Sequence, residues 1–63
     1  MRISLKAART NKNLTQQEAA DELKVSKKTV GSWESGKTVP TADKIDMICE
    51  LYGVSYDNIE WRS

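Results

Sequence analysis

One stretch decides the fold of this chain: Gln16–Ser35, QQEAADELKVSKKTVGSWES. Its small and apolar residues fall where two short helices joined by a tight turn need them. Ala19 and Leu23 stand four apart on one helical face, and Val30 and Trp33 stand three apart on another. Each half of the stretch is therefore amphipathic, and together the halves predict helix, turn, helix.

Capping residues mark the start of both helices. Thr15 can accept a hydrogen bond from the backbone N–H of Glu18 while the Glu18 carboxylate reaches back, the reciprocal arrangement that opens a helix. Ser26 is a suitable N-cap for the second segment. We therefore expect helices over about residues 16–23 and 27–35.

Apolar spacing outside this stretch predicts three further helices. The first covers about residues 2–12, and the fourth begins after Thr41 and ends at Gly53. A short fifth helix is expected over about residues 55–61. No strand-like alternation is visible. The expected fold class is all-α, a compact five-helix bundle forming a single domain over residues 1–63.

Three segments, LTQQEAADEL, KVSKKTVGSWESGKTVP and LYGVSYDNI, resemble the XRE-like helix-turn-helix family of phage Cro and CI repressors and their bacterial relatives. The resemblance covers about residues 5–59, and Gly36 and Pro40 also fit the family pattern. One position departs from it. The turn residue that is usually glycine is Lys24, and a non-glycine residue in a left-handed turn costs about 1 kcal/mol.

The resemblance implies a lambda-repressor-like domain that regulates transcription by binding double-stranded DNA. Helix 27–35 would lie in the major groove, and a homodimer of phage or prophage repressor type would bind a palindromic operator. The residues expected at the DNA are Gln16, Gln17, Ser26, Lys27, Lys28, Gly31, Ser32, Lys37 and Thr38. A structural ion pair is expected between Arg9 and Glu34.

Within the reading helix, a helical wheel turns Lys27, Lys28, Gly31, Ser32 and Ser35 outward. Lys28 is the first choice for a base contact and Lys27 for a phosphate; the alternative for both is a solvated surface. Gly31 either permits close approach to a base or sugar, or is simply tolerated at an exposed site. Trp33 is expected in the core or at its edge, and the alternative is a platform on which bases stack.

Charge is distributed unevenly although the formal net charge is only +1. Residues 1–14 carry four bases and no acid, and residues 24–37 carry four lysines against Glu34 alone. Acids dominate residues 15–23 and 38–63. Bases therefore cluster around the first helix and the reading helix, as a nucleic-acid partner requires. Ordinary solvated charge is the alternative interpretation.

Composition argues against several other classes of protein. The chain has no histidine and a single cysteine, Cys49, which is expected to be buried. We therefore expect no enzyme activity, no metal site and no cofactor. No apolar run approaches the roughly 20 residues of a membrane span, so no membrane association and a cytoplasmic location are expected.

Two further questions stay open at the level of sequence. The chain could be an antitoxin-like or protein-interaction module in which DNA binding is secondary. The subunit contact expected from the family lies in the C-terminal part, at Val54, Tyr56, Ile59 and Trp61. Tyr56 and Trp61 could equally belong to the core.

Overall fold

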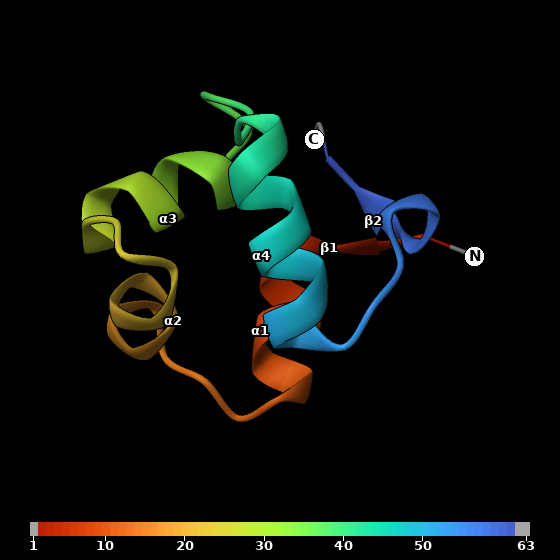
Figure 1. Cartoon of the computed structure of the whole chain (residues 1–63), viewed down its shortest axis with the longest axis horizontal. Coiled ribbons are helices and arrows are strands. Elements are labelled where there is room, and N and C mark those ends of the chain that lie inside the picture. Colours follow the sequence, from red (N-terminus) through yellow and green to blue (C-terminus); the bar gives the residue numbers. More distant parts are fainter. Residues whose placement is uncertain (1, 62–63) are drawn as a thin grey trace.

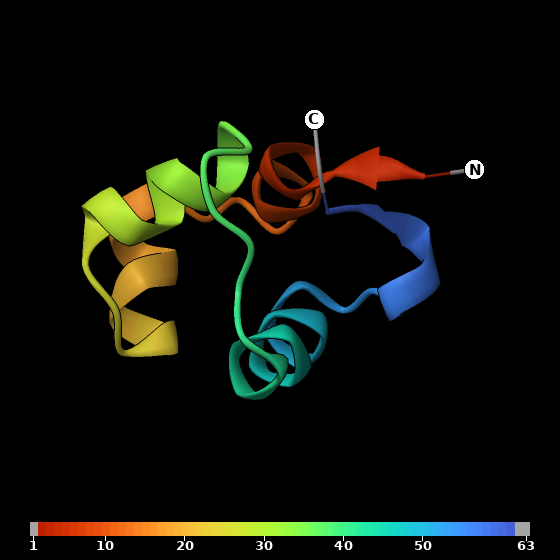
Figure 2. The same cartoon turned by 90° about the horizontal axis from the view of Figure 1, so that it is seen from above.

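The computed structural model of the chain describes residues 2–61. The helices and strands follow one another in the order β1 (Ile3–Ser4), α1 (Leu5–Asn11), α2 (Gln16–Leu23), α3 (Lys27–Glu34), α4 (Ala42–Tyr52), the 3-10 turn η1 (Tyr56–Asn58) and β2 (Ile59–Glu60). Figure 1 shows α2 and α3 on one side of the molecule and the two strands on the other, with α1 and α4 between them. In the perpendicular view, α3 (light green) lies at the upper left of the domain and α4 (teal) at the bottom (Figure 2).

The first helix begins later than the sequence predicted. Ser4 has an extended backbone, and its hydroxyl accepts a hydrogen bond from the backbone N–H of Ala7 at 3.0 Å. Ser4 is thus the N-cap, and α1 starts at Leu5. The preceding Ile3 and Ser4 are extended and form β1, where a helix beginning at about residue 2 was expected.

The predicted fifth helix was wrong. Only one 3-10 turn forms, after which Ile59 and Glu60 become extended as β2 and pair in parallel with β1. Ile59 lies opposite Ile3 and is 1% exposed. A β-branched side chain suits such a buried extended position, and a strand of two residues is too short to show alternation in the sequence. Within residues 2–61 the domain therefore has four α-helices rather than five.

The helix-turn-helix itself matches the prediction closely. Both parts of the Thr15 and Glu18 capping box are present, and the Ser26 hydroxyl accepts a hydrogen bond from the backbone N–H of Thr29 at 3.1 Å. Lys24 ends α2 in the left-handed conformation, with φ 59° and ψ 42°. The turn therefore keeps the left-handed geometry without the glycine that would adopt it at lower cost.

One continuous core joins the four helices to the strands. Ala19 and Ala20 are fully buried, which lets α2 lie close to its neighbours, and Trp33 is 8% exposed and belongs to the core as predicted. The rest of the core is formed by Leu5, Ala8, Leu23, Val30, Ile48, Tyr52 and Ile59. Cys49, predicted to be buried, is only half-buried on α4. The core fixes α3 through Val30 and Trp33 and leaves its other face at the surface.

Candidate nucleic-acid interface

An open groove runs along the outward face of α3. Its lining comes from the start of α2, from α3 and from the loop that follows α3, and comprises Gln16, Lys27, Lys28, Gly31, Ser32, Ser35 and Lys37. Six of these seven residues were expected at the DNA from the sequence. Helical periodicity explains the agreement for Lys27, Lys28, Gly31 and Ser32, because Val30 and Trp33 turn into the core and their neighbours must face out. Gln16 and Lys37 were expected from the family resemblance.

The groove carries positive charge without a neutralising partner. Lys27, Lys28 and Lys37 are all exposed. Within residues 2–61 the ion pairs join Arg2 to Glu60 and Arg9 to Glu34, so these three lysines have none. A surface with this charge attracts a polyanion, and its attraction weakens as salt is added.

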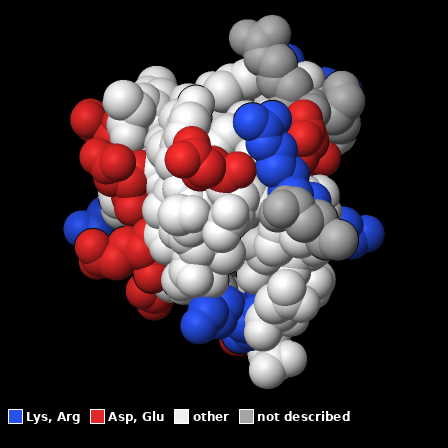
Figure 3. Space-filling model, turned by 90° about the vertical axis from the view of Figure 1, so that its right-hand side faces the viewer, with Lys and Arg blue, Asp and Glu red and all other residues white. Residues whose placement is uncertain are grey.

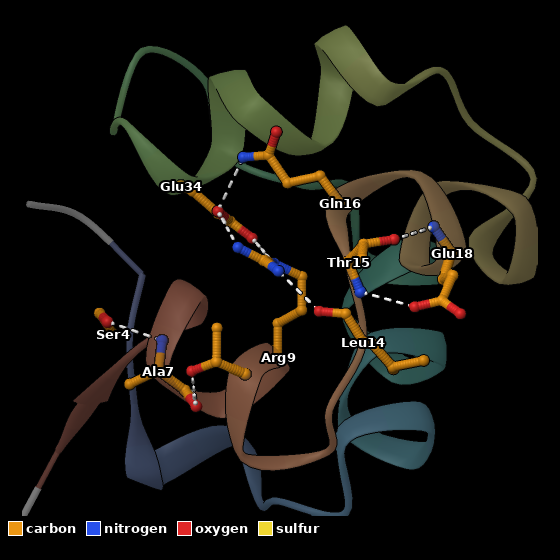
Figure 4. A network of polar contacts seen from close by, with 9 residues as sticks. Ser4, Ala7, Arg9, Leu14, Thr15, Gln16, Glu18 and Glu34 are labelled. Carbon is orange, nitrogen blue, oxygen red and sulfur yellow. Dashed lines mark hydrogen bonds and ion pairs between the residues drawn. The ribbon is translucent and has the colours of Figure 1, made fainter.

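A buried polar network fixes one wall of the groove. Arg9, on α1, donates from Nε to Glu34 Oε2 at 2.6 Å and from Nη2 to Glu34 Oε1 at 3.2 Å. Its Nη1 also donates to the backbone oxygen of Leu14 at 2.6 Å. The two charged side chains are 8% and 6% exposed. Figure 4 shows Arg9 lying between the end of α3 and the segment before α2, so that the expected ion pair ties three parts of the chain together.

Gln16 joins this network from the first turn of α2. Its Nε2 donates to Glu34 Oε1 at 3.0 Å, and its side chain crosses from α2 toward the end of α3 (Figure 4). Sequence reasoning expected this amide at a DNA phosphate and missed the contact with Glu34. An amide nitrogen has two hydrogens, so donating one to Glu34 leaves a second donor at the groove.

The network has clear electrostatic consequences. The hydrogen bond to Glu34 raises the pKa of Arg9, and its burial only partly opposes the rise. Tyr52, 3% exposed on α4, lies close enough to Arg9 and Glu34 to interact electrostatically with both side chains. Burial raises the pKa of Tyr52 to about 12, with a further contribution from the Glu34 carboxylate and an opposing one from Arg9. The Arg9 guanidinium therefore stays charged, and the phenol stays neutral, at neutral pH.

Three residues expected at the DNA do not line the groove. Gln17 donates from Nε2 to Asp21 Oδ1 at 2.9 Å, one turn along α2. The Ser26 hydroxyl caps α3 and lies 2.9 Å from the hydroxyl of Thr29. Thr38 is exposed in the loop beyond Lys37. Their local hydrogen bonds and loop position could not be read from a helical wheel.

Ser35 is the groove residue that was left out of the expected set. A helical wheel places Ser35 on the outward face. Ser35 is, however, the C-cap of α3, a position to which the family resemblance assigned no contact with DNA. Its hydroxyl donates to the backbone oxygen of Ser32 at 3.2 Å. Outward position alone was the signal that could have identified it.

The opposite end of the molecule presents a different surface. Tyr56, 56% exposed, and Trp61, half-buried, stack with ring centroids 5.4 Å apart and an interplanar angle of 25°. Trp61 Nε1 donates to the backbone oxygen of Tyr56 at 3.0 Å. Figure 3 views this end and shows an uncharged area at its centre, with acidic side chains along the left margin and both acidic and basic side chains above it. Tyr56 thus lies outside the core, and Trp61 packs against it. Ile59, expected at the subunit contact, is instead buried in the core at 1% exposure.

Residues 2–61 contain neither a metal-binding cluster nor a membrane-spanning helix. They hold no group of three or more histidine, cysteine, aspartate or glutamate side chains arranged to bind a metal ion. Among the described helices, none has the length and apolar character needed to cross a bilayer.

Comparison with known proteins agrees with the geometry. Residues 5–59 match the family model HTH_3, described as helix-turn-helix. A similar protein is the HTH-type transcriptional activator BcrR of Enterococcus faecalis, 38% identical over 55 residues. The match covers 87% of this chain but 27% of that protein, so the chain spans about a quarter of the length of its relative. No solved structure gives a comparable match.

Proposed function

Because the chain belongs to the helix-turn-helix family, we propose that it is a sequence-specific DNA-binding regulator of transcription whose α3 enters the major groove. The observation that carries this proposal is the groove on α3. Its outward face begins with Lys27 and Lys28, ends beside Lys37, and has no acidic residue among its lining. An α-helix fits the major groove of B-DNA, where each base pair presents a distinct pattern of donors and acceptors.

The lining residues divide into two roles. Lys28 lies in the first turn of α3, where a recognition helix contacts base edges, and its ammonium can donate to O6 and N7 of guanine. Lys27, Lys37 and the second hydrogen of the Gln16 amide would bind phosphates on either side. These contacts set the position of α3 without specifying sequence. The ion pair between Arg9 and Glu34 would help these contacts form, because it fixes the end of α3 relative to α1.

The proposed assembly on DNA is a homodimer on a palindromic operator. The longest dimension of the described domain is 28 Å, whereas half-sites read from one side of the duplex lie about 34 Å apart. One copy therefore covers one half-site. The stacked Tyr56 and Trp61 are the proposed subunit contact, because Tyr56 is 56% exposed and Trp61, which packs against the core, holds its ring in place.

The proposed mode of regulation is repression of the phage-repressor type. A bound dimer of this small domain would act most simply by occupying DNA that polymerase needs. The relative from Enterococcus faecalis is named an activator, and this chain spans 27% of it. The position of the operator relative to the promoter distinguishes the two modes, because repression requires overlap with the polymerase site.

The experiment that tests this proposal is selection of tight-binding duplexes from a randomised pool by the purified protein at near-physiological salt. We expect an enriched palindromic site that Lys28→Ala no longer selects. Lys6→Ala is the matched control, since it removes the same charge from an exposed position on α1 outside the groove. It should select the same site as the unmodified protein.

Two outcomes would count against the proposal. Failure of the unmodified, folded protein to enrich any sequence would overturn specific DNA binding and favour an interaction module. Equal losses for Lys28→Ala and Lys6→Ala would show that total charge, rather than the groove on α3, determines binding.

A further inference from the structure

We propose that Gly31 determines specificity by leaving space at the centre of α3 for the C5 methyl group of a thymine. This inference rests on the proposed function and names a feature of its target. Gly31 lines the groove and is only partly buried, so a partner can reach it. Glycine is, after proline, the residue that least favours a helix interior, and its presence there needs a physical reason.

Backbone conformation does not supply that reason. The glycines of the described chain with positive φ are Gly36 and Gly53, whereas Gly31 has the φ of an ordinary helical residue. Its carbonyl accepts a hydrogen bond from the backbone N–H of Ser35 at 3.0 Å, as in a regular helix. An alanine could therefore adopt the same conformation.

Packing within the protein does not supply it either. A Cβ atom added at Gly31 would meet Gln16 Nε2 at 3.9 Å and, apart from Val30, Ser32 and the backbone of its own helix, no other heavy atom within 4 Å. A separation of 3.9 Å is ordinary van der Waals contact. Gln16 could thus keep its hydrogen bond to Glu34 with alanine at this position. Within the described domain, nothing excludes a side chain, so we assign the space to a bound partner.

The position of Gly31 indicates which part of DNA would enter that space. Lys28 stands three residues before it and Ser35 four residues after it, so Gly31 lies in the middle of the outward face. Lys27 and Lys37, at opposite ends of the groove, would bind the flanking phosphates. The centre of a helix lying between two backbones faces base edges.

The chemistry of glycine narrows the choice of base. Its exposed group is an apolar methylene, which offers no hydrogen bond to a donor or acceptor of a base. In the major groove, thymine is the base whose edge projects an apolar methyl group, at C5. A thymine methyl against the Gly31 methylene buries both groups without leaving a polar atom unpaired.

The test is a double-mutant cycle in which one methyl group is removed from the DNA and one is added to the protein. The operator is selected first, and each thymine is then replaced by uracil, which lacks the C5 methyl and keeps the same pairing. Gly31→Ala adds one methyl to the protein. We expect this variant to bind the thymine operator about tenfold more weakly, the usual effect of one extra buried carbon in a filled space. Uracil at one thymine in each half-site should restore its affinity.

A second measurement separates binding from folding. Gly31→Ala should raise the melting temperature because alanine favours the helix. Thr10→Ala, exposed on α1 outside the groove, is a control that also introduces alanine without changing charge. It should leave the affinity for both operators unchanged.

The inference and the proposed function fail in different ways. If the unmodified protein selects no site, the function fails. If it selects a site that Gly31→Ala binds equally well, or if no uracil substitution relieves the weaker binding of Gly31→Ala, the thymine contact is overturned while DNA recognition stands.

Discussion

Arg9 and Glu34 are joined by two hydrogen bonds of 2.6 and 3.2 Å that tie α1 to the last residue of α3. Both side chains are more than nine-tenths buried. A buried pair is not in itself a large source of stability, because both charges lose their hydration. Its geometry instead restricts where the end of α3 can lie. Because α3 forms most of the groove, the pair also fixes the position of the groove.

Removal of one partner should therefore be costly. We expect Arg9→Met to lower the free energy of unfolding by about 3 kcal/mol or more, because it leaves the Glu34 carboxylate buried without its cation. The measurement is urea denaturation followed by circular dichroism. Arg2→Met is the matched control, since Arg2 and Glu60 are 3.8 Å apart with side chains 64% and 51% exposed. It should cost less than about 1 kcal/mol. Equal effects of the two substitutions would contradict the importance of burial.

The left-handed turn at Lys24 gives a second expectation. Lys24→Gly should stabilise the domain by about 0.5 kcal/mol, because relief of the left-handed backbone outweighs the added freedom of glycine in the unfolded chain. Asn13→Gly is the control, since Asn13 has φ 60° but asparagine tolerates that conformation better. It should give a smaller gain. A lower melting temperature for Lys24→Gly than for the unmodified protein would show that the turn is not strained.

How far the sequence predicted this structure depends on the range of the interactions. The capping box at Thr15, the helices on either side of Lys24 and the burial of Trp33 all depend on local spacing, and they were predicted correctly. The pairing of Ile3 with Ile59 joins the two ends of the domain. Such a contact leaves no periodic signal in strands of two residues, and a fifth helix was predicted instead.

The candidate site shows the same division. Helical periodicity placed Lys27, Lys28 and Ser32 on the outward face, where they line the groove. It could not show that Gln16 would donate to Glu34, because that contact spans two helices whose crossing is set by the core. Hydrogen bonds between distant segments depend on packing, which the linear pattern does not record.

Tyr52 gives an expectation about alkaline pH. Its pKa is raised to about 12 in the folded protein, whereas an unfolded tyrosine ionises near about 10. The unfolded chain therefore loses this proton first. The stability linked to Tyr52 is complete below about pH 10 and is lost as pH rises toward about 12, at up to about 1.4 kcal/mol per pH unit. Unfolding measured by urea at a series of pH values should show this decline.

Two phenylalanine substitutions isolate the contribution of Tyr52. Tyr52→Phe removes the ionisable phenol and should flatten the decline above about pH 10. Tyr56→Phe is the control, because 56% of Tyr56 already meets solvent in the folded protein, and it should leave the decline unchanged. An identical pH dependence for Tyr52→Phe and the unmodified protein would exclude Tyr52 as its source.

The lysines of the groove should differ in how their loss affects binding to DNA. Lys37, in the loop after α3, is proposed to neutralise a phosphate, so Lys37→Ala should weaken binding similarly for all sequences and reduce the log-log salt slope by about one. Lys28→Ala should instead reduce the preference for the selected operator over random DNA by about 1–3 kcal/mol. Fluorescence anisotropy with both duplexes at several salt concentrations measures each quantity. If Lys28→Ala changed only the salt slope and kept the full preference, Lys28 would be a phosphate contact and the base-reading residue would have to lie elsewhere on α3.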